Sequence, residues 1–144
     1  MIFAAATTAD VAGVVALLAA DAIGDVILGE DAAQAAYAVM LAEGNTQLFV
    51  ARDGVGVAAT YQLSILHGLS LTASCRAVLE GVRVRDDLRG QGIGAALLAD
   101  AEARARAAGA VRIQLTSKVQ RDRAHAFYAR HGFVASHVGM KKLL

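Results

Sequence analysis

The sequence predicts one α/β domain over residues 1–144, with a mixed β-sheet. Three observations predict this class. Apolar residues recur at helical spacing in the first third of the chain, alternate at strand spacing in the middle, and switch between both periods afterwards. A chain of 144 residues has the length of one ordinary domain. Its 56% of hydrophobic residues supply a core that needs no disulfide or metal staple.

The first third of the chain is predicted to contain a short strand followed by two helices. Ile2–Ala5 is apolar and is expected to form the strand. Thr8 is expected to cap a helix over Ala9–Ala20, because Thr accepts hydrogen bonds from the first amides of a helix. Asp21–Glu30 is expected to be a loop, and Asp31–Glu43 has the apolar spacing of a second helix.

The middle of the chain is predicted to form a hairpin and a third strand. Leu48–Arg52 and Val55–Leu66 are the hairpin strands, and Asp53-Gly54 between them is a favoured turn pair. A loop is expected over His67–Arg76. Ala77–Arg85 alternates as a strand does, and this alternation is expected to place four side chains on one face: Val78, Glu80, Val82 and Val84.

The last third begins with a polar turn over Asp86–Gly94, followed by a helix over Ala95–Ala108 that Gly109 ends. This helix is expected to place salt bridges on its wet side, Asp100 with Arg104 and Glu102 with Arg106. The remaining predicted elements are a strand over Val111–Thr116, a helix over Asp122–His131, and strands over Phe133–His137 and Met140–Leu144. The predicted order is βααβββαβαββ.

Composition excludes several classes of protein. The single cysteine, Cys75, excludes an intramolecular disulfide and a cysteine-based metal cluster. The four histidines lack metal-ligand spacing, so no metal is expected. The apolar run Val11–Ala20 is half the length of a membrane span. A pI near 8 is too low for a typical nucleic-acid protein. We therefore expect a cytoplasmic protein that binds neither membrane nor nucleic acid.

Charge is distributed unevenly along the chain. Residues 1–51 contain six acidic residues and no Lys or Arg, whereas residues 52–144 contain all fourteen basic residues and seven acidic ones. A basic segment favours an anionic ligand, and an acidic one favours a cationic partner. The alternative is that both sets of charges simply face water.

Arg89-Gly90-Gln91-Gly92-Ile93-Gly94 joins a predicted strand to a predicted helix. Glycines let the backbone approach a ligand, and the first amides of a helix attract anions such as phosphate. A tight turn without a ligand is the structural alternative. Gly90, Gly92 and Ala95 also fit a dinucleotide fingerprint, but no acid follows about 20 residues on. A Walker A loop is excluded, because no Lys-Ser/Thr follows the last glycine.

This loop resembles the acetyl-CoA loop of the GNAT superfamily of N-acetyltransferases. A second segment, Ala124–Phe133, resembles the late A-x-x-x-Tyr-x-x-x-Gly-Phe signature of the same superfamily, at the family's spacing. The strong motifs cover Leu79–Phe133, and the N-terminal half matches in element order. The resemblance implies an acetyl-CoA-dependent N-acetyltransferase whose two central strands splay apart to admit the cofactor.

The resemblance also implies roles for single residues. Glu80 would be the general base, because the apolar face expected around it favours a neutral carboxyl. Its alternative is a solvated Glu, or one paired with Arg83 or Arg76. Tyr128 would protonate the departing thiolate, and its alternative is ordinary core packing with Phe127 and Phe133. Cys75 is expected to be structural.

The backbone of Val82 and Val84 would contact pantetheine, with the Val82 amide facing the thioester oxygen. The full set of expected cofactor-binding residues is Val82, Arg83, Val84, Arg89, Gly90, Gln91, Gly92, Ile93, Gly94, Ala95, Ser117 and Arg121. Arg121 stands where many members have Asn, so it either meets a CoA phosphate or faces water.

The expected acceptor is a small amine or a peptide amine, and the acidic first third favours a cationic one. A second copy of the chain is a further candidate partner. Two other functions remain open on the same residues. One is a non-catalytic acyl-CoA-binding or regulatory module, and the other is a nucleotide-binding regulatory domain.

Overall fold

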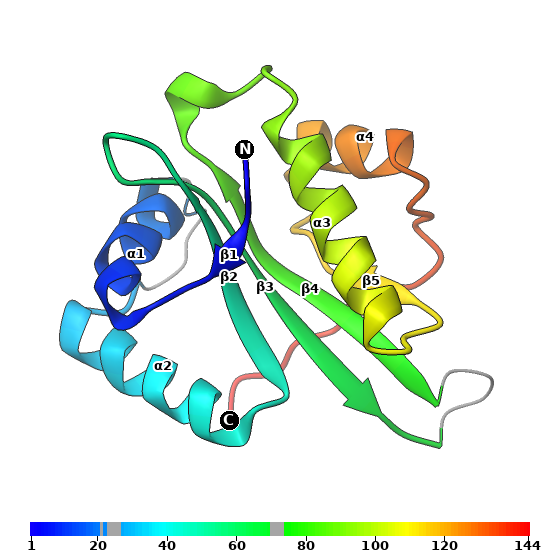
Figure 1. Ribbon diagram of the computed structural model, residues 1–144. Coiled ribbons are helices and arrows are strands. Elements are labelled where there is room, and N and C mark those ends of the chain that lie inside the picture. The colour runs from blue at the N-terminus through cyan, green and yellow to red at the C-terminus, as the bar shows by residue number, and fades with distance from the viewer. Residues whose placement is uncertain (21, 23–26, 70–73) are drawn as a thin grey trace.

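The computed structural model describes residues 1–20, 22, 27–69 and 74–144 (Figure 1). Its sheet has the order β1-β2-β3-β4-β5. The strands are β1 (Ala4–Ala5), β2 (Thr46–Arg52), β3 (Val57–His67), β4 (Cys75–Val84) and β5 (Ile113–Leu115). The helices are α1 (Val11–Ala20), α2 (Glu30–Glu43), α3 (Ile93–Ala107) and α4 (Asp122–Arg130), with short 3-10 turns η1 (Thr8–Asp10) and η2 (Asp86–Leu88). The predicted α/β class with a mixed sheet is confirmed.

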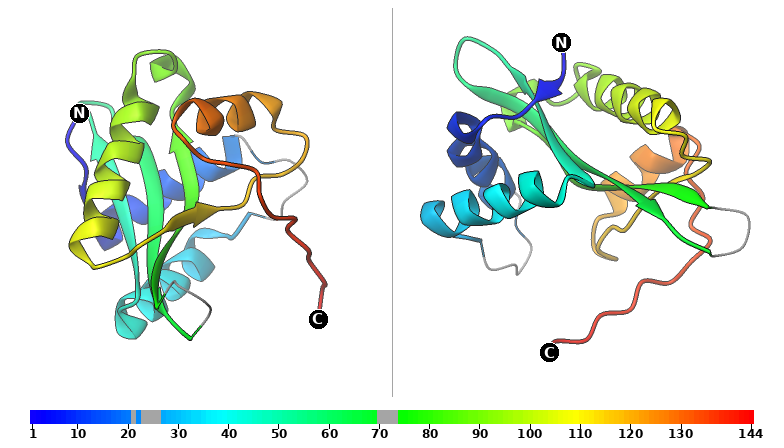
Figure 2. Two further views of the ribbon diagram at one scale, coloured as in Figure 1. Left: turned by 90° about the vertical axis from the view of Figure 1, so that its right-hand side faces the viewer. Right: turned by 60° about the horizontal axis from the view of Figure 1, so that its bottom comes forward.

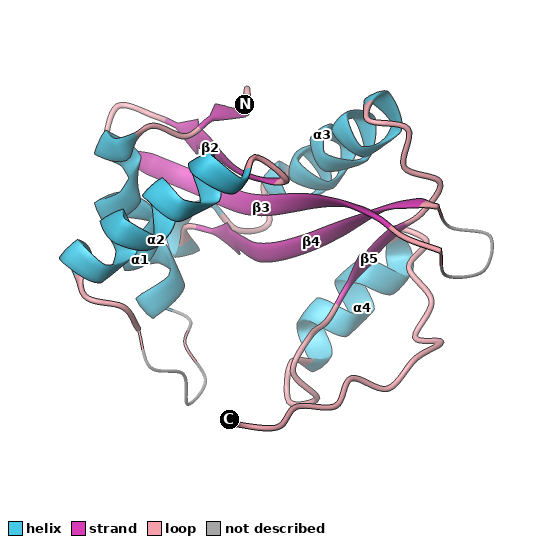
Figure 3. Cartoon of the chain, turned by 90° about the horizontal axis from the view of Figure 1, so that it is seen from below, coloured by secondary structure: helices cyan, strands magenta, loops and turns pink. Residues whose placement is uncertain are grey.

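Helices cover both faces of the sheet (Figure 2). The sheet is antiparallel from β1 to β4, and β5 joins β4 in parallel. One core cluster packs α3 against residues such as Tyr61 and Leu79, which are fully buried. The other packs α1 and α2 against β2 around Val50 and Tyr37. α4 lies beside β5, on the opposite side of the molecule from α1 and α2 (Figure 3).

The first helix begins differently from the prediction. Thr7, not Thr8, precedes the first turn, and Asp10 accepts hydrogen bonds from the Thr7 amide (2.6 Å) and hydroxyl (2.8 Å). Asp10 also accepts from Nε of Arg52 on β2 at 2.6 Å. A buried carboxylate therefore attaches the start of the helix to the sheet.

The α3 salt bridges agree with the prediction, and so does the hairpin, except that its second strand begins at Val57 and not at Val55. The Asp53 carboxylate accepts from the amides of Val55 and Gly56, which closes the turn between β2 and β3. On α3 the expected pairs form, Arg104–Asp100 at 2.8 Å and Arg106–Glu102 at 2.9 Å. These features depend on residues a few positions apart, so the local sequence determines them.

The two strands predicted at the C-terminus are wrong. Residues 133–137 and 140–144 form no strand, and apart from the partly buried Phe133 their large hydrophobic side chains are exposed, as at Val134 and Met140. In the described part of the chain the sheet ends at the three-residue strand β5. An alternating pattern makes a strand only where a neighbour completes its backbone hydrogen bonds.

The two predicted loops lie partly outside the described residues, which omit 21, 23–26 and 70–73. At their described ends, Glu30 already belongs to α2, and Cys75 and Arg76 belong to β4. None of the described helices is long and apolar enough to cross a membrane.

Candidate active site

The central feature of the site is an edge of β4 that β5 leaves uncovered. The described β4–β5 ladder pairs Ala77, Val78 and Leu79 with β5, and β4 then continues to Val84. The amide of Arg85 donates to Ala58 on β3 at 2.9 Å. Because backbone groups alternate along a strand, the amide and carbonyl of Val84 point the other way, to the uncovered edge.

A β-bulge at Gly81 changes the direction of the side chains that follow it. The register of β3 and β4 shifts between Thr60 and Gln62, and Gly81 has a positive φ of 58°. A bulge adds one residue to one strand, so the face on which later side chains lie is reversed. Val82 and Val84 therefore pack against the α3 core.

Glu80 consequently lies on the opposite face from Val82 and Val84, so the predicted shared face is wrong. Glu80 stands opposite Gln62 in the ladder, and Gln62 Nε2 donates to its carboxylate at 3.3 Å. Glu80 is exposed, so the burial expected around this carboxyl is absent. Its exposure and its hydrogen bond from Gln62 fit the solvated alternative considered for this residue.

The glycine loop has the backbone that a helix-terminal anion site requires. Gly90 and Gly92 have φ values of 76° and 80°, in the left-handed region that side chains disfavour. Gly92 is the residue before α3, so the first amides of that helix, from Ile93 onwards, lie at the loop. Apart from each glycine's own chain neighbours, no described atom lies within 4 Å of a Cβ built at either glycine. The loop is therefore open to a ligand.

The side chains of this loop contact its own surroundings. Arg89 pairs with Asp86 at 2.6 Å, and both are well exposed. Arg89 Nε also donates to the Val84 carbonyl at 3.4 Å, which connects the loop to the uncovered edge of β4. The Gln91 side chain donates to the carbonyl of Asp87 at 3.1 Å. The predicted cofactor residues of the loop are thus brought to the end of β4.

Arg85 holds the start of the loop against the β2–β3 hairpin. Its guanidinium binds Asp53 at 2.6 Å and Asp87 at 2.7 Å. The Arg85 hydrogen bond lowers the pKa of Asp53 to about 2 and also lowers that of Asp87. The turn and the loop are therefore attached by a charge pair that persists at neutral pH.

Helix α4 packs against the first turn of α3 at Gly94. A Cβ at Gly94 would lie 3.1 Å from Cζ of Phe127, so the missing side chain lets the Phe127 ring approach the helix. Ile93 is buried beneath this contact, and Ala95 is half-buried. This packing places α4, and with it Tyr128, beside the glycine loop.

Tyr128 is half-buried among aromatic rings. Its ring centroid lies 5.4 Å from that of Phe127 and 5.6 Å from that of Phe133. Burial raises the pKa of the phenol above its usual 10, while the positive charges of Arg83 and Arg121 oppose that shift. The hydroxyl is therefore protonated at neutral pH. Both the packing and the donor interpretation of Tyr128 fit this environment.

Arg83 and Arg121 converge on Tyr128 from different elements. Arg83 lies on β4, where its guanidinium donates to the Val82 carbonyl at 2.8 Å, and Arg121 is the residue before α4. Ser117 is half-buried two residues beyond β5. Cys75 is buried, and its thiol contacts the Ala108 carbonyl at 3.7 Å. No group of potential metal ligands was found among the described residues.

A hollow of about 170 Å³ lies on the other face of β4, between α1, α2 and the sheet. We call it the α1–α2 pocket. Its lining includes Leu18, Ala36, Tyr37, Met40, Gln62 and Gly81. Gln62 and Gly81 adjoin Glu80, so this pocket opens beside the predicted base.

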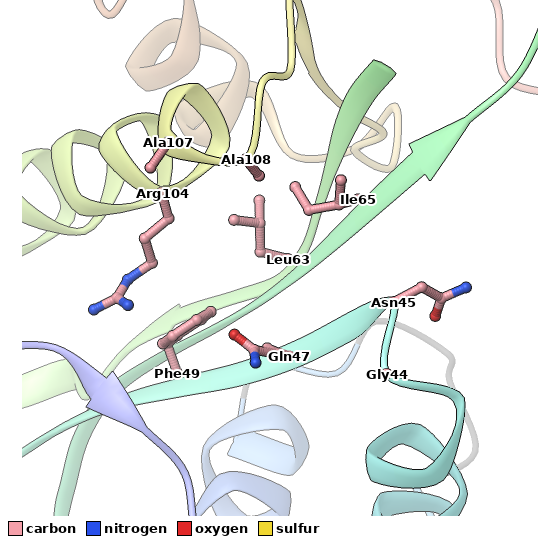
Figure 4. A pocket seen from close by; sticks show the side chains of 9 residues that line it. All are labelled: Gly44, Asn45, Gln47, Phe49, Leu63, Ile65, Arg104, Ala107 and Ala108. Atoms are coloured by element: carbon pink, nitrogen blue, oxygen red, sulfur yellow. The ribbon is translucent and has the colours of Figure 1, made fainter. Parts of the chain in front are cut away.

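A larger hollow of about 390 Å³ lies between the last turns of α3 and strands β2 and β3 (Figure 4). Arg104 stands over the Phe49 ring there, with Cζ 4.1 Å from the ring centroid. At 1.5 Å per residue, Arg104 is roughly 16 Å along α3 from Ile93. This hollow is therefore separate from the glycine loop.

Two residues of the site escaped the sequence analysis. Gln62 has no local signal, since only the β3–β4 register brings it to Glu80. Gly81 did carry a signal, because an isolated glycine within an alternating strand indicates a bulge. A bulge at Gly81 implies that Glu80 lies on the face opposite Val82 and Val84.

Comparison with known proteins gives a consistent result. The profile of the Acetyltransferase (GNAT) family matches residues 11–133. Over 57 residues the chain is 47% identical to the aminoalkylphosphonate N-acetyltransferase of Salmonella typhimurium (strain LT2), a match that spans 40% of the chain and 37% of that protein.

Solved structures extend the similarity to the whole chain. A transcriptional regulator from Bacillus halodurans C-125 is 34% identical, with a TM-score of 0.91 over 99% of both chains. A predicted acetyltransferase from Clostridium acetobutylicum, solved with acetyl-CoA, is 15% identical, with a TM-score of 0.78 over 97% of this chain and 95% of that one. The latter similarity concerns the fold.

Proposed function

Because the chain belongs to the Acetyltransferase (GNAT) family, we propose that it transfers an acetyl group from acetyl-CoA to a primary amine. The observation that carries this proposal is the uncovered edge of β4 beside the glycine-rich start of α3. An extended strand edge can pair with the amides of pantetheine, and a helix N-terminus can bind a pyrophosphate. The two halves of the cofactor thus find two different, adjoining surfaces.

The residues at these surfaces fit the cofactor. The left-handed backbone at Gly90 and Gly92 leaves open space at the loop, where phosphate oxygens can accept from backbone amides. Arg89 can join them, because its ion pair with Asp86 is exposed and such pairs contribute little stability. Val82 and Val84 offer backbone groups along the uncovered edge.

The chemistry requires one proton to leave the amine and one to reach the sulfur. The amine nitrogen attacks the thioester carbon, the new C–N bond forms, and the C–S bond breaks. Glu80 takes the amine proton, directly or through water, since its carboxylate is exposed on the face of the α1–α2 pocket. The Val82 amide stabilises the negative charge that develops on the thioester oxygen.

Tyr128 returns a proton to the leaving thiolate. Its raised pKa keeps the hydroxyl protonated, and Arg83 and Arg121 supply positive charge beside it. Those charges also favour the thiolate before it is protonated. An N-acetyltransferase among the relatives supports amine as the acceptor class.

A second candidate function is a regulatory module that binds acyl-CoA without catalysis. The observation that favours it is the 34% identity to a protein described as a transcriptional regulator, over 99% of both chains. Both functions share the cofactor surface, so cofactor binding alone does not separate them. Turnover does.

The test is a screen of primary amines with acetyl-CoA, measured by thiol release and by the mass of the product. We expect at least one amine to gain the mass of an acetyl group in place of one hydrogen. Binding of acetyl-CoA without any acetylated product across the panel would favour the regulatory module.

A further inference from the structure

The α1–α2 pocket is an apolar, partly open hollow that ends at the bulge of β4. Its lining combines aliphatic side chains of α1 and α2, among them Leu18 and Met40, with the ring of Tyr37. We propose, resting on the acetyl transfer proposed above, that it binds the apolar part of the acceptor. The substrate class is then a primary amine that carries an apolar group of about the size of a benzene ring.

The size of the pocket sets the size of that group. Its volume is about 170 Å³. Apolar protein cavities of about 150 Å³ stay free of water and bind benzene. A phenyl ring or a branched alkyl group therefore fits the pocket.

The two polar side chains of the lining, Tyr37 and Gln62, each donate a hydrogen bond. The Tyr37 hydroxyl donates to the Ala6 carbonyl at 2.7 Å, which leaves its ring as a wall of the pocket. The Gln62 amide donates to Glu80 at 3.3 Å. The lining residues that the structure describes carry no formal charge. The pocket itself therefore favours an apolar group over an ammonium group.

Position connects the pocket to the reacting atoms. Gly81 lines the pocket and lies between Glu80, the proposed base, and Val82, whose amide faces the thioester oxygen. A Cβ at Gly81 would lie 3.9 Å from Cδ2 of Leu18, so the pocket reaches the bulge itself. An amine whose apolar group fills the pocket can thus place its nitrogen at the Glu80 carboxylate.

None of the acidic residues that the structure describes in the first third is among the lining residues of this pocket. Asp10 is buried against Arg52. Glu30 and Asp31 lie in the first turn of α2, where their negative charges interact favourably with the helix dipole. Asp21 and Asp25 lie outside the described residues. In this proposal the Glu80 carboxylate attracts the ammonium group of the acceptor, and the apolar lining selects which acceptor binds.

The test compares two amines that differ only in the ring: 2-phenylethylamine and ethylamine. Transfer of a benzene-sized group from water to an apolar pocket favours binding by about 10- to 100-fold. We expect kcat/KM to be higher by that factor for 2-phenylethylamine. Equal values for the two amines would overturn the assignment of the pocket while leaving acetyl transfer intact.

A pair of variants on α2 locates the effect. Ala36 lines the pocket and is exposed, whereas Ala35 is exposed on the same helix and is not among the lining residues. Ala36→Phe should lower the ratio of kcat/KM for 2-phenylethylamine over ethylamine about tenfold. Ala35→Phe should keep the ratio of the wild type. The inference fails if both variants change the ratio equally.

Calorimetry keeps the test decisive if neither amine is acetylated. Titration of 2-phenylethylamine into the protein with CoA present should show binding that Ala36→Phe weakens and Ala35→Phe retains. That result would support the pocket while the proposed catalysis fails. Absence of binding to the wild type would overturn the pocket assignment.

Discussion

Replacing Gly92 with valine is expected to abolish cofactor binding without unfolding the protein. Gly92 precedes α3 with a φ of 80°, and apart from its chain neighbours no described atom lies within 4 Å of its Cβ position. The valine therefore meets no obstacle, and its effect comes from the backbone. A non-glycine residue in the left-handed region costs about 1–2 kcal/mol, and up to about 3 when β-branched and strained.

That cost is smaller than the stability of an ordinary domain, which is about 5–15 kcal/mol. The loop will instead relax to a conformation with negative φ, which turns its amides away from the phosphate position. A hydrogen bond to a charged group contributes about 1.5–3 kcal/mol. Loss of two such amides predicts a loss in acetyl-CoA affinity of about 10²- to 10⁴-fold.

Gly109 provides the matched control. It follows α3 at its other end, with the same φ of 80° and the same open surroundings. Gly109→Val should therefore lower the melting temperature about as much as Gly92→Val does, yet keep the affinity of the wild type. Calorimetric titration with CoA and thermal melting measure the two quantities. Equal affinities for the two variants would refute the assignment of the loop.

Three further changes test the catalytic roles and the attachment of the first helix. Glu80→Gln should lower turnover about 10²- to 10⁴-fold, with CoA affinity unchanged in calorimetry. Unaltered turnover would leave Glu80 as a surface residue. Tyr128→Phe should lower kcat with little change in KM or melting temperature, and any basic limb above about pH 10 should vanish, because the pKa of this phenol is raised. Full turnover of that variant would mean that water protonates the thiolate. The Arg52 hydrogen bond lowers the pKa of Asp10 to about 2 in the folded protein, so the unfolded chain binds more protons at low pH. The stability that the Asp10–Arg52 pair contributes is therefore present above about pH 4 and is lost as the pH falls towards 2. Asp10→Asn should cost about 1–2 kcal/mol of unfolding free energy at pH 7, allowing for the partly exposed Arg52. Between about pH 4 and pH 2, the free energy of unfolding in urea should change less with pH in this variant than in the wild type. The remaining change includes the titration of Asp53.

Local signals in the sequence determined much of the fold and the cofactor surface. The Asp53-Gly54 turn and the Asp100–Arg104 pair follow from residues next to each other or one helical turn apart. Gly90 and Gly92 have the backbone that their residue type predicts, although α3 begins at Ile93, two residues before the predicted start at Ala95. In each case the interacting groups are close in the chain, so the tertiary structure has little to add.

Tertiary structure alone decided the acceptor side of the site. The bulge at Gly81 places Glu80 opposite Gln62 and away from Val82, against the predicted alternation. The α1–α2 pocket exists because two helices and three strands meet there. The predicted C-terminal strands, at 133–137 and 140–144, lack a neighbour in the sheet. Register, side-chain face and cavity shape depend on contacts between residues far apart in the chain, and a periodic pattern in one segment does not specify which partner that segment will meet.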